Sequence, residues 1–274
     1  IKLGGIGNYV PNSVIKGMLA AIGIILILKQ LPHLVGYDKD YEGDETFVQL
    51  SGENTFSSFV NSLNSITPMA FLIGILGLVI LMIYETKWIK SIKIFQLING
   101  PLVVVIVGVV INNTLGNIDA VLTAKEAHLV TLPIAHSGSE FLSFLKFPDW
   151  SMILNKEVWM VAITISLVAS LETLLSIEAV DKLDSLKRVS PPNRELIAQG
   201  TGNMISGMFG GLPLTSVIVR SSANVNAGAK TKMSSVYHGI LIMLSLFLFP
   251  GLLNMIPKAA LAAILVFTGY KLAK

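Results

Sequence analysis

Apolar residues fall into long runs along this chain, and short connectors between the runs carry most of the charged side chains. The runs cover residues 13–35, 68–84, 97–110, 157–177, 236–253 and 259–270. Long apolar runs of this kind are typical of helices that cross a bilayer. Residues 56–66 are amphipathic and rich in serine, which favours a helix at the membrane interface. The pattern predicts an all-α polytopic membrane protein.

Composition supports this class and excludes several others. Hydrophobic residues make up 53% of the chain and charged residues 14%, whereas soluble domains carry about 25% charged residues. The net charge of +3 reflects membrane topology, so we expect no nucleic-acid partner. The chain has no cysteine, and its four histidines lie near segment ends or in a connector. No nucleophile–base pair or metal cluster is visible, so the sequence predicts neither an enzyme nor a bound cofactor.

Lysine and arginine are concentrated on alternate connectors. The richer set comprises Lys87, Lys90, Lys93, Lys182, Lys187, Arg188, Arg194, Lys230, Lys232, Lys271 and Lys274. The positive-inside rule places this set in the cytoplasm. The alternation holds only if residues 193–211 and 213–224 each cross the membrane. The acidic connector at residues 37–54 then lies outside, and its charge is typical of a solvated loop.

A polar, glycine-rich stretch interrupts the apolar pattern at residues 193–232. Gly202 and Ser206 lie four residues apart, a spacing of small residues that lets helix backbones approach closely in lipid. The sequence GGLP at residues 210–213 then breaks the chain at membrane depth, where a break must be buried in protein or line a wet cavity. Pro213 suits the first turn of a new helix. Transporters use such discontinuous helices at the substrate site, but a kinked helix pair without a ligand is an alternative.

This break predicts the substrate site. The predicted substrate-binding residues are Pro213, Leu214, Thr215, Ser216 and Arg220. The backbone N–H groups at the start of the new helix, with the Thr215 and Ser216 side chains, would bind an anion. Arg220 would add positive potential to this site. Alternatively, it pairs with Glu172 or with a group at the cytoplasmic side.

Glu172 lies well inside an apolar run, where an ionisable side chain costs at least about 2.5 kcal/mol. We therefore expect it to face the bundle interior or water. Thr173 and Ser176 are on the same helix and can flank it. The three residues predict a coupling-ion site, in which Glu172 either ligates sodium or carries a proton. A structural carboxylate, hydrogen-bonded to its neighbours or paired with Arg220, is the alternative.

The glycine-rich stretch resembles the signature region of the SulP family of inorganic anion transporters. The shared features are a G-G-[FL]-P break, an Arg seven residues after the Pro, and an N-x-x-[SA]-G-x-[KR]-[ST] tail. The matching residues are Gly210, Gly211, Leu212, Pro213, Arg220, Asn224, Ala227, Gly228, Lys230 and Thr231. The string SLETLL at residues 170–175 is similar to the S-[IL]-[DE]-T-L-L helix of bicarbonate-type bacterial members. Ile218 and Val219 depart from the residues usual in that family.

The resemblance implies a fold of two inverted repeats of seven segments, divided into a core and a gate domain. Residues 1–115 would be gate helices, about segments 5–7, and residues 116–156 an extracellular connector. Residues 157–255 would be core helices, about segments 8–11, with the broken helix at residues 210–224. Residues 256–274 would start a further gate helix. We expect a longer protein, whose other half completes the anion site and which a STAS domain follows in typical members.

The resemblance also implies a function: secondary active transport of a small anion by alternating access, coupled to sodium or protons. The anion would be bicarbonate, sulfate or a carboxylate, which are recognised mainly by charge and backbone N–H groups. A homodimer in the bacterial inner membrane is implied as well. One alternative is a nucleobase-type carrier of the same fold, but such carriers usually have an acidic residue in the broken helix, and residues 213–224 have none. The other is a channel or scaffold segment without coupled transport.

Overall fold

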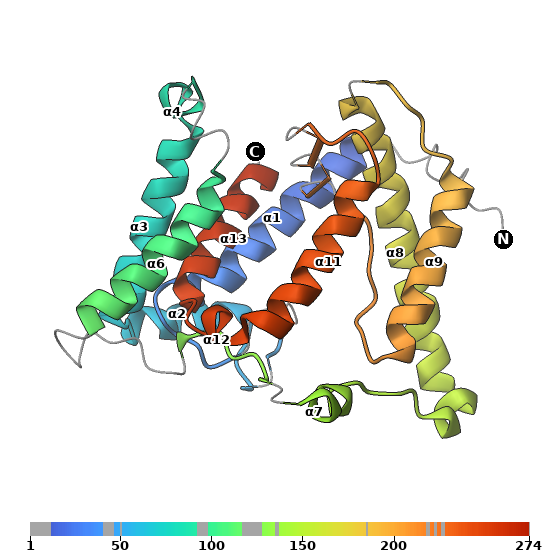
Figure 1. The fold of residues 1–274 in the computed structure, drawn as a ribbon, viewed down its shortest axis with the longest axis horizontal. Helices are drawn as coiled ribbons and strands as arrows, with labels where there is room; N and C mark the ends of the chain where they lie inside the picture. Colours follow the sequence, from blue (N-terminus) through green and yellow to red (C-terminus); the bar gives the residue numbers. More distant parts are fainter. Residues whose placement is uncertain are drawn as a thin grey trace. The chain divides into compact units, whose positions relative to one another are not determined.

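The computed structural model describes ten stretches of the chain. They are residues 12–40, 47–49, 51–91, 98–116, 128–134, 137–184, 186–217, 220–221, 224–225 and 228–273. The chain forms two compact units, one made of residues 1–15 and 135–247, the other of residues 16–134 and 248–274 (Figure 1). We describe each unit separately. The assignment of gate and core helices remains a prediction.

The described residues of both units are mainly helical. The first unit contains α7 (Gly138–Ser143), the 3-10 helix η3 (Trp150–Leu154), α8 (Lys156–Leu183), α9 (Pro192–Met208) and α11 (Met233–Leu248). The second unit contains most of α1 (Asn12–Leu34), with α2 (Thr55–Asn64), α3 (Pro68–Glu85), α4 (Lys87–Ser91), α6 (Gly100–Gly116), α12 (Pro250–Leu253) and α13 (Lys258–Ala273). The predicted all-α class is confirmed.

The helices follow the apolar runs, with shifted ends. α3 and α8 are long and apolar enough to cross a membrane. α8 continues to Leu183, beyond the predicted end at residue 177, and is 28 residues long. The run predicted at residues 236–253 divides into α11 and α12 at Phe249–Pro250. Proline causes this division because it has no N–H to continue the helical hydrogen bonds.

In the second unit, α3 packs against α6 and α13 through small side chains. Ala259, Ala260, Ala262 and Ala263 of α13 are all buried. A Cβ added at Gly77 of α3 would lie 2.9 Å from the Cβ of Ala263. Small residues at such contacts let helix backbones approach closely where lipid provides no hydrophobic driving force. The core of this unit is therefore built by close helix approach as well as by large side chains.

The acidic connector of the second unit is partly buried, so the prediction of a solvated loop was wrong for Asp38 and Asp40. The side chain of Asp38 is only 2% exposed, and its two oxygens lie 2.6 Å from Nδ1 of His33 and 2.6 Å from Nδ1 of His128. Burial alone raises the pKa of Asp38, but hydrogen bonds from His128 and His33 outweigh it and lower the pKa below its usual value. Asp38 thus ties the end of α1 to the segment around His128.

Replacing Asp38 with asparagine is expected to lower the melting temperature of the full-length protein at neutral pH. The substitution removes the charge that strengthens two buried hydrogen bonds, and this lowers the free energy of unfolding by about 2 kcal/mol. Because the pKa of Asp38 is lowered in the fold, its contribution is present above the usual pKa of 3.8 and is lost as pH falls through the folded value. Thermal unfolding across pH measures this. A difference between wild type and Asp38→Asn that stays constant down to the most acidic pH would contradict it.

Candidate functional site

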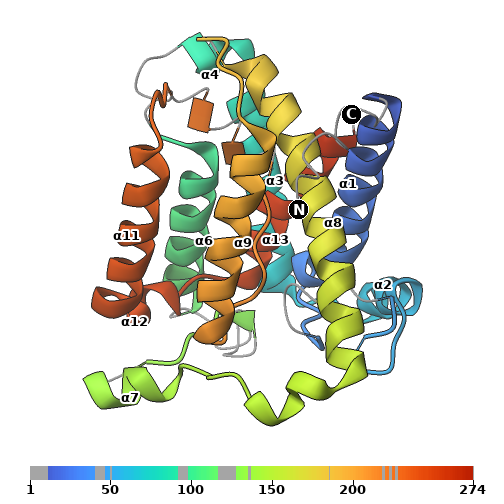
Figure 2. The same ribbon diagram turned by 90° about the vertical axis from the view of Figure 1, so that its right-hand side faces the viewer.

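The polar break after α9 is an extended segment in the first unit. Gly210 turns the chain with a φ of +79°, a conformation that favours glycine. A Cβ added there would also lie 2.7 Å from the carbonyl oxygen of Lys146, so the position leaves no room for a side chain. From Gly211 to Val217 the backbone is extended and runs back alongside α9 (Figure 2). We call residues 211–217 the break strand.

The predicted helix start at Pro213 is wrong. The N–H of Ser221 donates to the carbonyl of Val217 at 3.1 Å, which is the spacing of a first helical hydrogen bond. Residues 220–221 and 224–225 are helical. Among the described residues, those from 211 to 217 are not helical and Arg220 is the first helical one, so Pro213 does not start the helix. Side chains of α8 and α9 hold the backbone before it in the extended form.

One face of α9 supplies a ladder of hydrogen bonds to the break strand. Asn203 pairs with Leu214 in both directions: its Oδ1 accepts from the Leu214 N–H at 2.7 Å and its Nδ2 donates to the Leu214 carbonyl at 2.8 Å. Gln199 Nε2 donates to the same carbonyl at 3.1 Å, and Ser206 Oγ donates to the carbonyl of Leu212 at 3.3 Å. The three side chains recur every three or four residues and share one helix face. The sequence analysis missed Gln199 and Asn203, although their four-residue spacing beside a break was a visible signal.

α8 holds the other side of the break strand. Thr215 Oγ1 donates to the carbonyl of Ala169 at 3.1 Å and lies 3.0 Å from Thr173 Oγ1. The N–H of Ser216 donates to Thr173 Oγ1 at 3.3 Å, and Ser176 Oγ donates to the Ser216 carbonyl at 2.9 Å. Thr173 is 0% and Ser176 3% exposed. The structure thus brings the residues predicted for the coupling ion, Thr173 and Ser176, against those predicted for the substrate, Thr215 and Ser216.

These contacts correct the predicted use of the backbone. The N–H groups of Leu214 and Ser216 are engaged by side chains and do not point into an open anion site. Two cavities border the strand instead. One, of about 300 Å³, is lined by Leu214, Thr215 and Ser216 with Gln199 and Asn203, and the other, of about 370 Å³, by Pro213 with parts of α8 and α9. The break strand therefore offers mainly side-chain groups to a ligand.

Glu172 lies beside this polar cluster on α8. Ser176 follows it by one helical turn and reaches the break strand, so residues 172 and 176 are on the same side of the helix. The side chain of Glu172 is half-buried. That Glu172 faces polar surroundings, as expected of an ionisable group in an apolar helix, remains a prediction.

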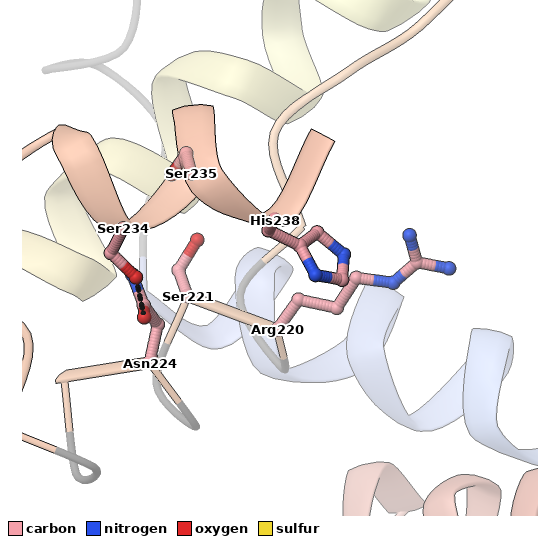
Figure 3. A pocket seen from close by; sticks show the side chains of 6 residues that line it. All are labelled: Arg220, Ser221, Asn224, Ser234, Ser235 and His238. Carbon is pink, nitrogen blue, oxygen red and sulfur yellow. Dashed lines mark hydrogen bonds between the residues drawn. The ribbon is translucent and has the colours of Figure 1, made fainter. Parts of the chain in front are cut away.

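Arg220 lines a separate cavity of about 680 Å³. The residues around it are Arg220, Ser221, Asn224, Ser234, Ser235 and His238 (Figure 3). The side chains of Arg220 and His238 lie together at one end, and Ser234 Oγ donates to Asn224 Oδ1 at the other. Among the described residues, Arg220 forms no ion pair with a carboxylate. The structure thus does not bring Arg220 to the cavity that Thr215 and Ser216 line.

The described residues thus combine helices long and apolar enough to cross a membrane with a polar break held between α8 and α9. A model of the Sulfate permease family matches residues 1–274. The chain belongs to this family. The prediction of SulP membership is confirmed.

Relatives of the chain carry transporter names. It is 27% identical over its whole length to a Bacillus subtilis protein named as a sulfate transporter, YvdB, and covers 47% of that protein. It is 25% identical to the bicarbonate transporter BicA of Synechocystis, with 96% of this chain and 42% of BicA covered. It is 26% identical to the chloroplastic sulfate transporter 4.1 of Arabidopsis thaliana, with 97% and 36% covered. The chain spans half or less of the length of these relatives.

Solved structures show the same fold. The transmembrane domain of a cyanobacterial BicA matches with a TM-score of 0.75 at 22% identity, covering 99% of this chain and 62% of that one. The structure of SLC26A9 matches with a TM-score of 0.72 at 17% identity, covering 97% of this chain and 39% of that one. The chain has the all-α fold of these membrane transporters.

Proposed function

We propose that the protein of which this chain is part is a secondary active transporter for a small inorganic or carboxylic anion. Family membership supports anion transport, and the relatives' names point to sulfate and bicarbonate. One structural observation carries the proposal: the break strand is held at its backbone by α8 and α9 and bordered by two cavities. An irregular backbone at membrane depth is tolerated where it lines such a cavity. It is also where transporters bind substrate.

The proposed anion contacts are the side chains of Thr215 and Ser216, with Pro213 and Leu214 shaping the cavity walls. Arg220 acts from the neighbouring cavity, where it raises the electrostatic potential along the path of the anion. The Ser216 hydroxyl fits an oxyanion, because it donates one hydrogen bond without adding a fixed charge. Thr215 would have to release the carbonyl of Ala169 to donate as well. The acidic residue usual in nucleobase carriers is absent from residues 213–224, which disfavours that alternative.

The proposed coupling site is Glu172 with Thr173 and Ser176. One face of α8 would offer sodium a carboxylate and two hydroxyls, and the break strand would add the Ser216 carbonyl beside them. A hard cation prefers several oxygens of this kind. A proton would need only the carboxyl group. We favour sodium on this count of oxygens. The bacterial inner membrane and a homodimer remain predictions.

Uptake by the full-length protein in proteoliposomes tests the proposal. Labelled bicarbonate, sulfate and a dicarboxylate are offered in turn, with an inward sodium gradient, an inward proton gradient, or no gradient. We expect one anion to accumulate above its outside concentration under one of the two gradients. Equilibration without any response to a gradient would favour the channel alternative. Absence of uptake for every anion would refute anion transport.

Replacing Arg220 with alanine is expected to raise the Michaelis constant for the anion about tenfold. A positive charge several ångströms from an anion contributes about 1–2 kcal/mol in a wet site. Arg220→Lys keeps the charge and should retain most of the affinity, although it loses the planar fork. Uptake kinetics of both variants measure this. If Arg220→Ala transports with unchanged kinetics, Arg220 is not part of the path.

A further inference from the structure

Side-chain hydrogen bonds fix the conformation of the turn that connects α8 and α9. Arg188 holds Asp184 with two side-chain bonds, from Nε at 2.7 Å and from Nη2 at 3.0 Å, and with its own N–H at 3.1 Å. Such bidentate pairing fixes the geometry of both side chains. The hydrogen bond from Arg188 lowers the pKa of Asp184 to about 2, so the pair stays ionised at physiological pH. Asp181 holds the far end of the turn through the N–H of Ser190 at 2.8 Å.

Arg188 also braces this turn to a second one. Its Nη1 donates to the carbonyl of Lys230 at 2.7 Å, in the turn that precedes α11. Both turns lie at the same end of the first unit, where α8 ends and α9 and α11 begin (Figures 1 and 2). Lys187, Arg194, Lys230 and Lys232 are exposed at this end. In the described part of the chain, Asp184 pairs with Arg188 and Asp181 accepts from Ser190, so neither carboxylate pairs directly with these four basic side chains.

The turn between α8 and α9 exposes apolar side chains next to its basic ones. Leu186 is 57% and Val189 84% exposed, on either side of Lys187 and Arg188. Lys187 has a φ of +50°, a left-handed conformation that a residue with a side chain adopts at some cost. The bonds around Asp184 hold it in that conformation. Strained positions of this kind cluster at sites with a role in binding.

We propose that the two turns form a contact surface for the head groups of anionic phospholipids. Lys187, Lys230 and Lys232 bind the phosphates, and Leu186 and Val189 insert among the upper parts of the acyl chains. Topology alone accounts for basic residues at a cytoplasmic end. It does not account for two highly exposed apolar side chains beside them, which are typical of a surface that lies in the membrane interface. Basic clusters next to a membrane span attract anionic lipids.

Native mass spectrometry of the full-length protein in mixed micelles tests the surface with phosphatidylglycerol and phosphatidylcholine as probes. We expect the wild type to retain phosphatidylglycerol preferentially. The triple variant Lys187→Gln, Lys230→Gln, Lys232→Gln should lose roughly a hundredfold of this preference, because each basic residue near an anionic surface contributes a factor of about five. The control Lys39→Gln, Lys146→Gln, Lys156→Gln removes the same charge from exposed residues outside the two turns and should keep the preference.

Two further measurements separate a lipid surface from a site for free phosphate. The variant Leu186→Ser, Val189→Ser keeps every charge and should bind phosphatidylglycerol several-fold more weakly. Glycerol phosphate, the soluble head group, should compete poorly with the lipid. The proposal fails if the triple lysine variant keeps the wild-type preference while it melts at the wild-type temperature. It also fails if glycerol phosphate competes as well as the lipid, or if the serine variant binds lipid as the wild type does.

Discussion

Replacing Ser216 with glutamate is expected to abolish anion binding. Ser216 lines the cavity of about 300 Å³ beside the break strand, and its backbone is fixed on both sides by Thr173 and Ser176. The new carboxylate would therefore stand where the anion binds. Two like charges about 4 Å apart repel by about 4 kcal/mol at an effective dielectric constant of 20. Such repulsion lowers affinity roughly a thousandfold.

Ser216→Gln is the matched control, because it adds nearly the same volume without the charge. It should weaken binding only by steric crowding, much less than glutamate does. Equilibrium binding of labelled anion to the full-length protein measures both variants, and thermal unfolding shows whether they fold. If Ser216→Glu binds the anion with wild-type affinity, the break strand does not form the substrate site.

The helices could be predicted from sequence because each apolar run is long and bounded by polar or proline residues. The end of α8 was placed too early for a physical reason. Its last turns carry charged side chains such as Asp181. A charged composition is typical of a connector, but here the helix continues through it past the apolar run. An apolar run predicts the part of a helix that lies in lipid. The helix itself can continue beyond the lipid into the membrane interface.

The position of the break was predictable, but its conformation was not. Pro213 favours the first turn of a helix by its local geometry. That preference is weak compared with the hydrogen bonds that Asn203 and Gln199 make to Leu214. Those partners lie on α9, and although their four-residue spacing is visible in the sequence, it does not show which backbone groups they bind. Tertiary contacts therefore determine the conformation of the break strand, which is not helical.

The candidate site was predicted as two separate residue sets, and the structure joined them. Composition singled out Thr173 and Ser176 beside Glu172, and the break singled out Thr215 and Ser216. About forty residues separate the two sets along the chain, so their contact depends on how α8 and the break strand pack. Packing also places Arg220 at a different cavity from the one that Thr215 and Ser216 line. Sequence gives the residue types suited to a site, and packing decides which of them meet.

Replacing Glu172 with glutamine is expected to abolish uphill accumulation of the anion. If Glu172 ligates sodium, the variant keeps the shape but loses the charge that offsets the ion. Uptake then stops or no longer responds to sodium. If Glu172 carries the coupling proton, the variant resembles the protonated form. Exchange of anion across the membrane then continues while net accumulation is lost.

Anion uptake with and without sodium at fixed pH distinguishes the two mechanisms. The contact of Ser176 with the break strand makes sodium the favoured outcome, because the Ser216 carbonyl would then share the ion with Glu172. Glu178→Gln is the matched control: it makes the same change six residues along α8 and should accumulate anion as the wild type does. If Glu172→Gln also accumulates anion uphill at the wild-type level, Glu172 is a structural carboxylate. The coupling site then lies elsewhere in the full-length protein.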